Sequence, residues 1–396
     1  MITKIKTLSA QYLAEIIAIR RHLHANPELS YKEVETGRYI AVQLAAMGIA
    51  YMHGVAENGV VGLIYGRNPT SKTVALRADF DALPILEKND VEYKSKNEGV
   101  MHACGHDAHT ASLLGAARIL HKLRDEWDGT VKLIFQPAEE KLPGGASIMI
   151  REGVLHNPDV DLIIGQHVHP PMKAGRVGMR AGSYMASADE IYVTIKGKGG
   201  HGAMPQDCVD PVAIMATIIT TLQQIVSRNA PPTAPSVLTF GKIIANGATN
   251  IIPDEVYMEG TFRTFDEGWR TTAHQKMIRM AEGIAESMGG SCEFRIDVGY
   301  PVLHNDTKLT ERAFQHAIDY LGEAQVEELP IRMTAEDFAY YSHKIPAVFY
   351  RLGTGNAALN THNPLHTANF NIDESSLEIG MGLFAFMAYQ ELQNRA

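Results

Sequence analysis

Hydrophobic and polar positions along residues 1–186 follow the periods of helices and strands in turn. Apolar side chains recur at helical spacing over residues 8–24, 35–48 and 107–123. Between these segments lie short apolar runs typical of buried strands, which read GVVGLIYG at 59–66, TVALRADFDALP at 73–84, TVKLIFQPAEE at 130–140 and VDLIIGQHVHP at 160–170. The alternation predicts an α/β fold in which helices flank a large, mostly parallel sheet.

Polar side chains gather directly after three of these apolar runs. Open parallel sheets bind ligands at the edge formed by the carboxyl ends of their strands. We therefore expect the polar side chains to converge on CGHDAH at 104–109: Asp79 and Asp81, Glu139 and Glu140, His167 and His169. Pro170 and Pro171 are expected to redirect the chain, so only one of the last two histidines is a good candidate ligand.

From about residue 187 the pattern changes to alternating, half-exposed strands. The order is strand–helix–strand–strand–helix–strand, and Asp210-Pro211 supplies a cap and a first-turn residue for the first helix. This order is that of a ferredoxin-like sandwich. We predict a small βαββαβ domain at 187–298, inserted into a larger domain formed by residues 1–186 and 299–396.

Composition limits the class of protein. A chain of 396 residues is long for one hydrophobic core and favours two domains. The net charge of −9 and the lack of a basic run argue against nucleic-acid binding. No stretch of about 18 apolar residues occurs, and three widely spaced cysteines do not suggest a disulfide framework. We expect a cytoplasmic protein that contacts neither nucleic acid nor membrane.

The segment Cys104-Gly105-His106 has the donors of a transition-metal site. Gly105 would let the backbone turn tightly enough for both side chains to face one ion. Taken alone, such a segment is more often a loop with unrelated histidines, and a cysteine nucleophile with a histidine base is another alternative. Glu139 and Glu140 are also ambiguous alone, although they follow an apolar strand and point to different sides of it.

An earlier pair, His22 and His24, offers a competing metal site. An H-x-H pair near the N-terminus is typical of barrel-type amidohydrolases, in which it lies on a strand. In this chain the pair falls within the helix predicted at 8–24, where residues i and i+2 point in different directions. We therefore expect both histidines to be structural.

Several later residues are weak candidates individually. His201 lies among glycines in GKGGHGAMP, which suggests a backbone that approaches another group closely. Arg263, on a predicted strand, could clamp a carboxylate or form an ordinary salt bridge. Others of suitable chemistry are Asn250, Glu336, Asp337 and His366.

The candidate residues taken together indicate a metal site more specifically than any one of them does alone. Cysteine, histidine and carboxylate side chains recur at strand ends across the larger domain, and they suit a pair of divalent ions such as Zn, Mn, Ni or Co. Such a site predicts an activated water that attacks a carbonyl, with a glutamate as base.

Eight segments, in order, resemble the aminoacylase/carboxypeptidase family of di-metal peptidases. The nearest branch is that of the amidohydrolases that include hippurate hydrolase, N-acyl-amino-acid deacylases and plant auxin-conjugate hydrolases. The resemblance spans about residues 13–390 and rests on RADFDALP, MHACGHDAHTASLLGAA, FQPAEE, GQHVHP, GKGGHGAMP, NIIPDEVYMEGTFRTF, AEDF and PLHTANF.

The resemblance implies a role for each matching residue. Glu139 would be the general base, and Asp81 would orient a metal ligand. His201 would reach the neighbouring subunit's active site in a dimer and stabilise the oxyanion. The resemblance also implies that the small domain at 187–298 is a lid and dimerisation domain. The free carboxylate of the substrate would be bound by Asn250 and Arg263. The ligands of two divalent ions would be Cys104, His106, Glu140, His167 and His366.

Two positions depart from other branches of the family. Asp79 stands where those branches have a histidine, and Cys104 stands where they have a bridging aspartate. The nearest branch shares both replacements, which leave the identity of the metal and the occupancy of the two sites open.

We predict a metal-dependent amidohydrolase that cleaves small-molecule N-acyl amino acids or peptide-like conjugates and forms a homodimer or homotetramer. A dipeptidase or carboxypeptidase with the same mechanism is the nearest alternative. A non-catalytic binding protein of the same fold and a thiol hydrolase using Cys104 are two further alternatives.

Overall fold

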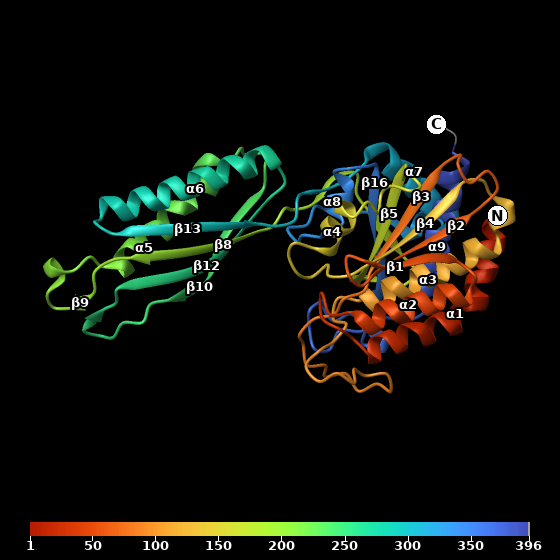
Figure 1. Ribbon diagram of the computed structural model, residues 1–396, viewed down its shortest axis with the longest axis horizontal. Coiled ribbons are helices and arrows are strands. Elements are labelled where there is room, and N and C mark those ends of the chain that lie inside the picture. Colours follow the sequence, from red (N-terminus) through yellow and green to blue (C-terminus); the bar gives the residue numbers. More distant parts are fainter. Residues whose placement is uncertain (395–396) are drawn as a thin grey trace. The chain divides into compact units, whose positions relative to one another are not determined.

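The computed structural model describes residues 1–394, which form two compact units (Figure 1). The first unit contains Met1–Tyr184, His304–Pro330 and the chain from Asp337 onward, and the second contains Met185–Leu303 and Ile331–Glu336. Two short strands, β7 (Gly182–Met185) and β14 (Leu303–Asn305), lie where the chain passes from one unit to the other.

An eight-stranded sheet forms the centre of the first unit, in the order β1-β2-β4-β3-β5-β16-β6-β15. Its four middle strands, β4, β3, β5 and β16, pair in parallel. Every residue of β3 is buried, because helices cover both faces of the middle strands. The strands are β1 (Ala50–Val55), β2 (Gly59–Tyr65), β3 (Thr73–Asp79), β4 (Thr130–Gln136), β5 (Leu162–Lys173), β6 (Val177–Met179), β15 (Val326–Glu328) and β16 (Ala347–Gly355).

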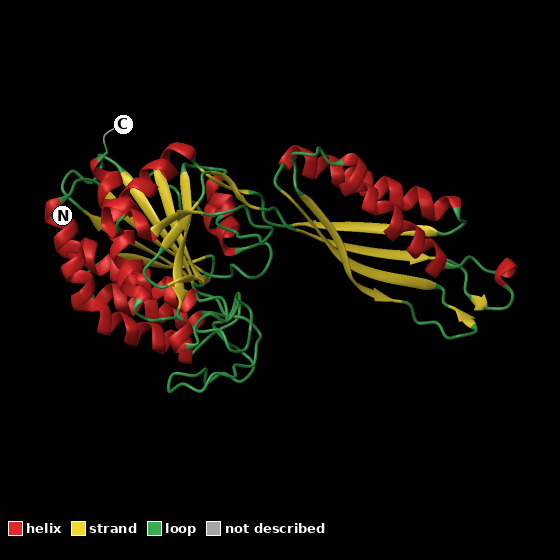
Figure 2. Ribbon diagram, turned by 180° about the vertical axis from the view of Figure 1, so that it is seen from behind, coloured by secondary structure: helices red, strands yellow, loops and turns green. Residues whose placement is uncertain are grey.

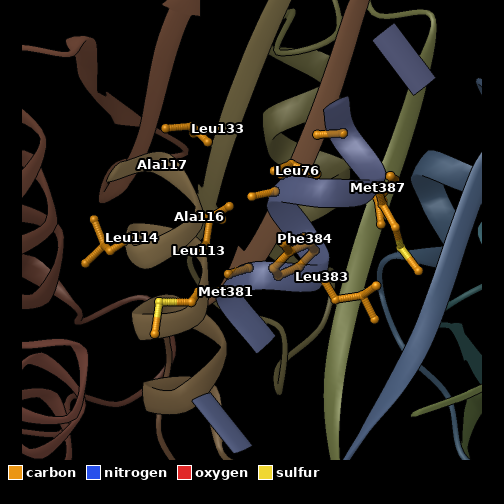
Figure 3. Close-up of a cluster of buried hydrophobic side chains, with 14 of the residues drawn as sticks. Leu76, Leu113, Leu114, Ala116, Ala117, Leu133, Met381, Leu383, Phe384 and Met387 are labelled. Atoms are coloured by element: carbon orange, nitrogen blue, oxygen red, sulfur yellow. The ribbon is translucent and has the colours of Figure 1, made fainter. Parts of the chain in front are cut away.

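Helices flank this sheet, as the sequence predicted (Figure 2). They are α1 (Ile2–Ala25), α2 (Val34–Ala46), α3 (His106–Lys122), α4 (Gly145–Arg151), α7 (Thr307–Leu321), α8 (Ala339–Ser342) and α9 (Ser376–Gln393). Figure 3 shows Leu113 of α3 and Met381 and Phe384 of α9 packed together near Leu76 of β3. This apolar layer fixes α3, and therefore its N-terminus, against the carboxyl ends of the strands.

Strand β5 differs from expectation at its prolines. The prediction that Pro170 and Pro171 redirect the chain is wrong, because β5 continues through both to Lys173. β3 pairs with β5 only over Leu162–Gly165, so β5 needs no backbone donors on that side where the prolines occur. On its other side, the pairing with β16 becomes irregular at the same level.

The second unit has the predicted βαββαβ order. Its antiparallel sheet runs β10-β12-β8-β13, and α5 and α6 pack on one face (Figure 1). In β8, Ile191, Val193 and Ile195 are buried and alternate with more exposed residues, as a strand covered on one side requires. The elements are β8 (Asp189–Lys196), β9 (Gly200–His201), α5 (Pro211–Gln224), β10 (Ser236–Ile244), β11 (Ile251–Ile252), β12 (Glu255–Thr264), α6 (Glu267–Ser287) and β13 (Ser291–Val298).

Local signals explain two helix starts in this unit. Asp210 accepts hydrogen bonds from the backbone of Val212 and Ala213 at the start of α5, which confirms the predicted cap. Asp266 does the same for α6 through the backbone of Trp269. Among the described residues, no helix is both long and apolar enough to cross a membrane, and all three cysteines are free.

Candidate metal centre

The carboxyl ends of β3, β4 and β5 meet the N-terminus of α3. Asp81 follows β3, Glu139 and Glu140 follow β4, and His167 lies within β5. Cys104 and His106 come from the start of α3, while His366 comes from the loop after β16. The structure thus brings together the five residues proposed as ligands from the sequence and the two proposed acids, Glu139 and Asp81.

Cys104 is common to two groups of potential ligands. Its Sγ lies 3.4 Å from Nε2 of His167. Cys104, His106 and His167 form one group whose donor atoms all lie within 4.8 Å of one another, and Cys104, Glu140 and His366 form a second. The sulfur of Cys104 therefore belongs to both of these groups of donor atoms.

The two adjacent glutamates face this space in different ways. Oε1 of Glu140 lies 3.2 Å from Nε2 of His366 and 3.9 Å from Nε2 of His106. Glu139 is 6% exposed, and its Oε2 lies 4.0 Å from Nε2 of His106. Both carboxylates therefore border the donor cluster, and Glu140 is the one in closer contact with the histidines.

His106 supplies a test of whether the site fits a cation. Its Nδ1 donates to Oδ1 of Asp81 at 3.0 Å, and its buried Nε2 has no hydrogen-bond partner among the described residues. Burial opposes a charge on this imidazole, but Asp79, Asp81 and Glu140 outweigh burial and raise the pKa of His106 to about 10. An unpartnered nitrogen in such a negative field is suited to a metal ion.

The thiol of Cys104 is not set up as a nucleophile. Burial and the carboxylates of Glu140 and Glu139 raise its pKa well above the ordinary value. A reactive cysteine needs the opposite surroundings, which stabilise the thiolate. Gly105 has a φ of 86°, and a Cβ there would lie 2.5 Å from Cγ2 of Val168. The tight turn thus requires glycine and directs Cys104 towards the cluster. The raised pKa of Cys104 counts against the thiol-hydrolase alternative.

Asp79 and His109 are near the cluster but are engaged elsewhere. The backbone N–H of Val168 donates to Nε2 of His109 at 2.9 Å, so the proton of His109 is on Nδ1, which donates to Asp79 at 2.6 Å. Asp79 also accepts from Nη1 of Arg77 at 2.6 Å. Because both nitrogens of His109 are used, this residue cannot also bind a metal in this arrangement.

His109 is a residue whose role sequence reasoning missed. It holds the backbone N–H of Val168, and the carbonyl of the same residue lies 2.8 Å from Nδ1 of His167. This contact leaves Nε2 of His167 directed towards Cys104. The only signal in the sequence is the i, i+3 spacing from His106, which places both on one side of α3.

The competing pair His22 and His24 does not form a metal site. His24 is buried and contacts Asp107 at 2.7 Å and Glu87 at 3.1 Å, whereas His22 stacks on the ring of Tyr39. Both histidines lie on helix α1, as expected, so the barrel-type alternative is wrong. Asp107 is turned towards α1, where Arg20 also binds it.

Three further predicted residues, His201, Asn250 and Arg263, lie in the second unit. Nδ1 of His201 accepts from the backbone N–H of Ala203 at 3.0 Å, so its proton is on the exposed Nε2. Asn250 adjoins it, because the carbonyl of Asn250 accepts from Gly202. Arg263 lies near the other end of β12, where its Nη1 donates to the carbonyl of Met333 at 3.1 Å.

Strand β12 separates these residues within one chain. His201 and Asn250 lie beyond the Glu255 end of the strand, since β9 pairs with β11. From Glu255 to Arg263 an extended strand spans about 26 Å, at about 3.3 Å per residue. The structure therefore brings His201 and Asn250 together but keeps Arg263 apart from both.

The fold and the cluster define a class of hydrolase, and comparison with known families agrees. The profile of the family described as peptidase family M20/M25/M40 matches residues 75–390. The chain belongs to this family. The predicted class of enzyme, a metal-dependent amidohydrolase, is confirmed.

Individual relatives are similar over most of the chain. The N-acyl-L-amino acid amidohydrolase of Geobacillus stearothermophilus is 46% identical over 304 residues, which cover 76% of this chain and 81% of that protein. The thermostable carboxypeptidase 2 of Saccharolobus solfataricus is 41% identical, with 94% of each chain covered. The solved YXEP protein of Bacillus subtilis, described as a dinuclear metal-binding peptidase of the M20 family, has a TM-score of 0.82 at 35% identity and covers 98% of this chain and 100% of its own.

Proposed function

We propose that this protein hydrolyses the amide bond of N-acyl amino acids and releases a carboxylic acid and a free amino acid. The observation that carries the proposal is the cluster of donor side chains, buried except at His366 and Glu140, in which Cys104 belongs to two groups of potential ligands beside the carboxylate of Glu139. The similarity to an N-acyl-L-amino acid amidohydrolase supports the class of substrate.

The ligand set suits two divalent ions of the Zn, Mn, Ni or Co group. Their ligands would be Cys104, His106, Glu140, His167 and His366. When bound, such ions lower the pKa of water and polarise a carbonyl group. Asp81 keeps the Nδ1 proton of His106 in place, which leaves Nε2 free to act as a ligand.

Glu139 is the general base in this mechanism. It borders the cluster, while Glu140 is turned towards His366. The carboxylate of Glu139 takes a proton from the attacking water and then transfers it to the nitrogen of the leaving amino acid. Nε2 of His201 carries a proton and donates to the oxygen that becomes negatively charged.

A homodimer accounts for the separation of the lid residues. We place His201 and Asn250 in the active site of the partner, and we keep Asn250 and Arg263 as the residues that bind the substrate carboxylate. This assigns the inserted unit, predicted at 187–298, as lid and dimerisation domain. The free cysteines are consistent with a cytoplasmic location.

Replacement of Glu139 tests the base. We expect Glu139→Ala to lose activity by at least about 1,000-fold while it retains wild-type metal content, because the residue moves protons rather than holding ions. Glu140→Ala is the matched control and should lose bound metal. Metal analysis and turnover of N-acetyl, N-benzoyl and longer-chain acyl amino acids are the measurements. Loss of metal from Glu139→Ala would reassign Glu139 as a ligand.

A carboxypeptidase is the second candidate, favoured by the similarity to thermostable carboxypeptidase 2. The same substrate panel extended with dipeptides and short peptides distinguishes the two. A higher kcat/KM for peptides than for every acyl amino acid would establish the carboxypeptidase. No turnover of any substrate with Zn, Mn, Ni or Co would indicate a binding protein.

A further inference from the structure

The loop that carries Glu139 and Glu140 is held by a segment from the beginning of the chain. This loop, residues 137–144, connects β4 to α4. The segment that contacts it, residues 28–33, connects α1 to α2, and in the sequence it is notable only for the helix-breaking NPE at 26–28.

Two side chains of the segment make polar contacts with the loop, and a third contacts Asp81, which itself binds the loop. Oε1 of Glu33 accepts from the backbone N–H of Ala138 at 2.8 Å. The hydroxyl of Tyr31 donates to the carbonyl of Lys141 at 3.0 Å and accepts from the N–H of Gly144 at 3.2 Å. The loop is therefore fixed at both ends.

The third contact passes through Asp81. Oγ of Ser30 donates to Oδ2 of Asp81 at 2.7 Å, and the same oxygen accepts from the backbone N–H of Glu140 at 2.9 Å. Asp81 also holds His106. The segment thus contacts both chain neighbours of Glu139: Glu33 binds Ala138 directly, and Ser30 is linked to Glu140 through the carboxylate of Asp81.

The segment is itself rigidly placed. Oε2 of Glu28 accepts from the backbone N–H and the hydroxyl of Thr36, both at 2.8 Å, and so satisfies the start of α2. The carbonyl of Glu28 accepts from the N–H of Ala82 at 2.8 Å, which fastens the segment to the end of β3. The segment is therefore anchored both to α2 and to the end of β3.

The contact at Ala138 has a direct consequence for Glu139. Ala138 has a φ of 54°, a left-handed conformation that is unfavourable for a residue with a Cβ. The hydrogen bond to Glu33 and the one from Gly145 to the carbonyl of Ala138 hold this peptide. The backbone angle at Ala138 sets the direction in which the next side chain, Glu139, leaves the chain.

The carboxyl group of Glu33 lies where burial is energetically unfavourable for it. It is fully buried, and burial together with the charge of Asp81 raises the pKa of Glu33 to about 7. Its other oxygen accepts from Nδ2 of Asn58 at 3.3 Å. A buried carboxyl group is unfavourable unless its hydrogen bonds are needed, and the stronger of these is to the loop.

We infer that Glu33, assisted by Tyr31, is a positioning residue that orients the carboxylate of Glu139 through the backbone of Ala138. The inference rests on the proposed role of Glu139 as base. It makes no use of metal ligation, since neither side chain contacts a residue of the ligand set.

Kinetics of the metal-loaded, full-length protein provide the first test. We expect Glu33→Ala to lower kcat by about 10- to 100-fold, because a small displacement of a base is enough for such a loss. KM should stay within about twofold and metal content should be unchanged, since binding groups are not touched. Glu33→Gln, whose amide oxygen can accept from Ala138, should recover most of kcat.

Two further variants serve as safeguard and control. Tyr31→Phe removes only a hydroxyl and should lower kcat in the same way by a smaller factor, even if Glu33→Ala folds poorly. Glu35→Ala, at an exposed position two residues away, should behave like wild type. Equal kcat for Glu33→Ala and Glu35→Ala, or loss of metal from Glu33→Ala, would overturn the inference.

Amide hydrogen exchange of residues 137–144 provides a readout that does not depend on activity. We expect faster exchange in Glu33→Ala than in wild type and restored protection in Glu33→Gln. Unchanged exchange would show that Glu33 does not hold the loop. If exchange responds as expected but Glu139→Ala remains active, the support of the loop stands and the assignment of the base fails.

Discussion

A single hydrogen bond determines what His106 can do. Asp81 accepts the Nδ1 proton of His106 at 3.0 Å, and this leaves Nε2 as the nitrogen available to a metal. The same aspartate accepts from the backbone of Glu140. Asp81 therefore aligns two proposed ligands that come from different elements.

The Asp81→Asn variant should bind metal about 10- to 100-fold more weakly than wild type. The amide can still accept a hydrogen bond, but it removes a negative charge that stabilises the imidazole and the bound cation. Competition with a chromophoric chelator measures the affinity. Asp90→Asn, at an exposed aspartate, is the control, and wild-type affinity in Asp81→Asn would show that Asp81 does not orient a ligand.

The chemical types of the site residues could be identified from the sequence, but their hydrogen-bond partners could not. The donors of Cys104, Glu140 and His366 could be proposed because their chemistry and their places after strands are visible in the sequence. Nothing local distinguishes His109, which holds a peptide, from His106, whose Nε2 is left without a partner. The difference depends on contacts with Val168 and Asp79, which belong to other strands.

At the scale of elements, α7 and α9 are joined by a buried carboxylate. Glu391 of α9 accepts hydrogen bonds from Nε and Nη2 of Arg312 of α7 and contacts Nε2 of His316 at 3.1 Å. Burial alone would raise the pKa of Glu391, but the bonds from His316 and Arg312 outweigh burial and lower it from 4.5 to about 2.

This arrangement predicts a pH-dependent contribution to stability. Because folding lowers the pKa of Glu391, the unfolded chain takes up the proton first as the pH falls, so the contribution is complete above about pH 4.5 and disappears towards pH 2. Glu391→Gln should reduce the free energy of unfolding at pH 7 by about 1–2 kcal/mol, allowing for partial solvent screening.

Urea denaturation at pH 7 and at about pH 3 measures this effect, and the difference between variant and wild type should shrink by about half at the lower pH. Asp319→Asn, on the exposed side of α7, is the control and should have little effect. An equal difference at both pH values would show that the charge of Glu391 is not responsible.

Elements were predicted best where their period is regular. The alternation in β8 and the cap at Asp210 are local and appeared in the structure as expected. The prediction failed at Pro170 and Pro171, because the effect of a proline on a strand depends on which neighbours pair there. Pairing is a property of the sheet, which the local sequence does not contain.

At the scale of the whole molecule, the separation within the second unit predicts that catalysis depends on two subunits. His201 lies beyond the Glu255 end of β12 and Arg263 lies near the other end, and the strand spans about 26 Å from Glu255 to Arg263. If His201 acts in the partner's site, Glu139→Ala and His201→Ala chains should complement each other. One site of the mixed dimer would combine an intact Glu139 with an intact His201.

Each variant alone should be nearly inactive, and a mixture allowed to exchange subunits should recover about a quarter of the wild-type activity. The fraction follows because about half of the dimers are mixed and each has one complete site. Light scattering with tagged chains verifies that mixed dimers form. Mixed dimers without activity would place His201 outside the partner's site.

The sequence by itself determined the class of fold, the order of elements and the types of side chain at the strand ends. Periodicity and donor chemistry are local properties, so they can be read directly from the residues. Only the tertiary structure decided which nitrogen of each histidine is engaged, that residues 28–33 support the loop of Glu139, and that Arg263 is separated from His201. These features depend on contacts between distant parts of the chain, and such contacts exist only after folding.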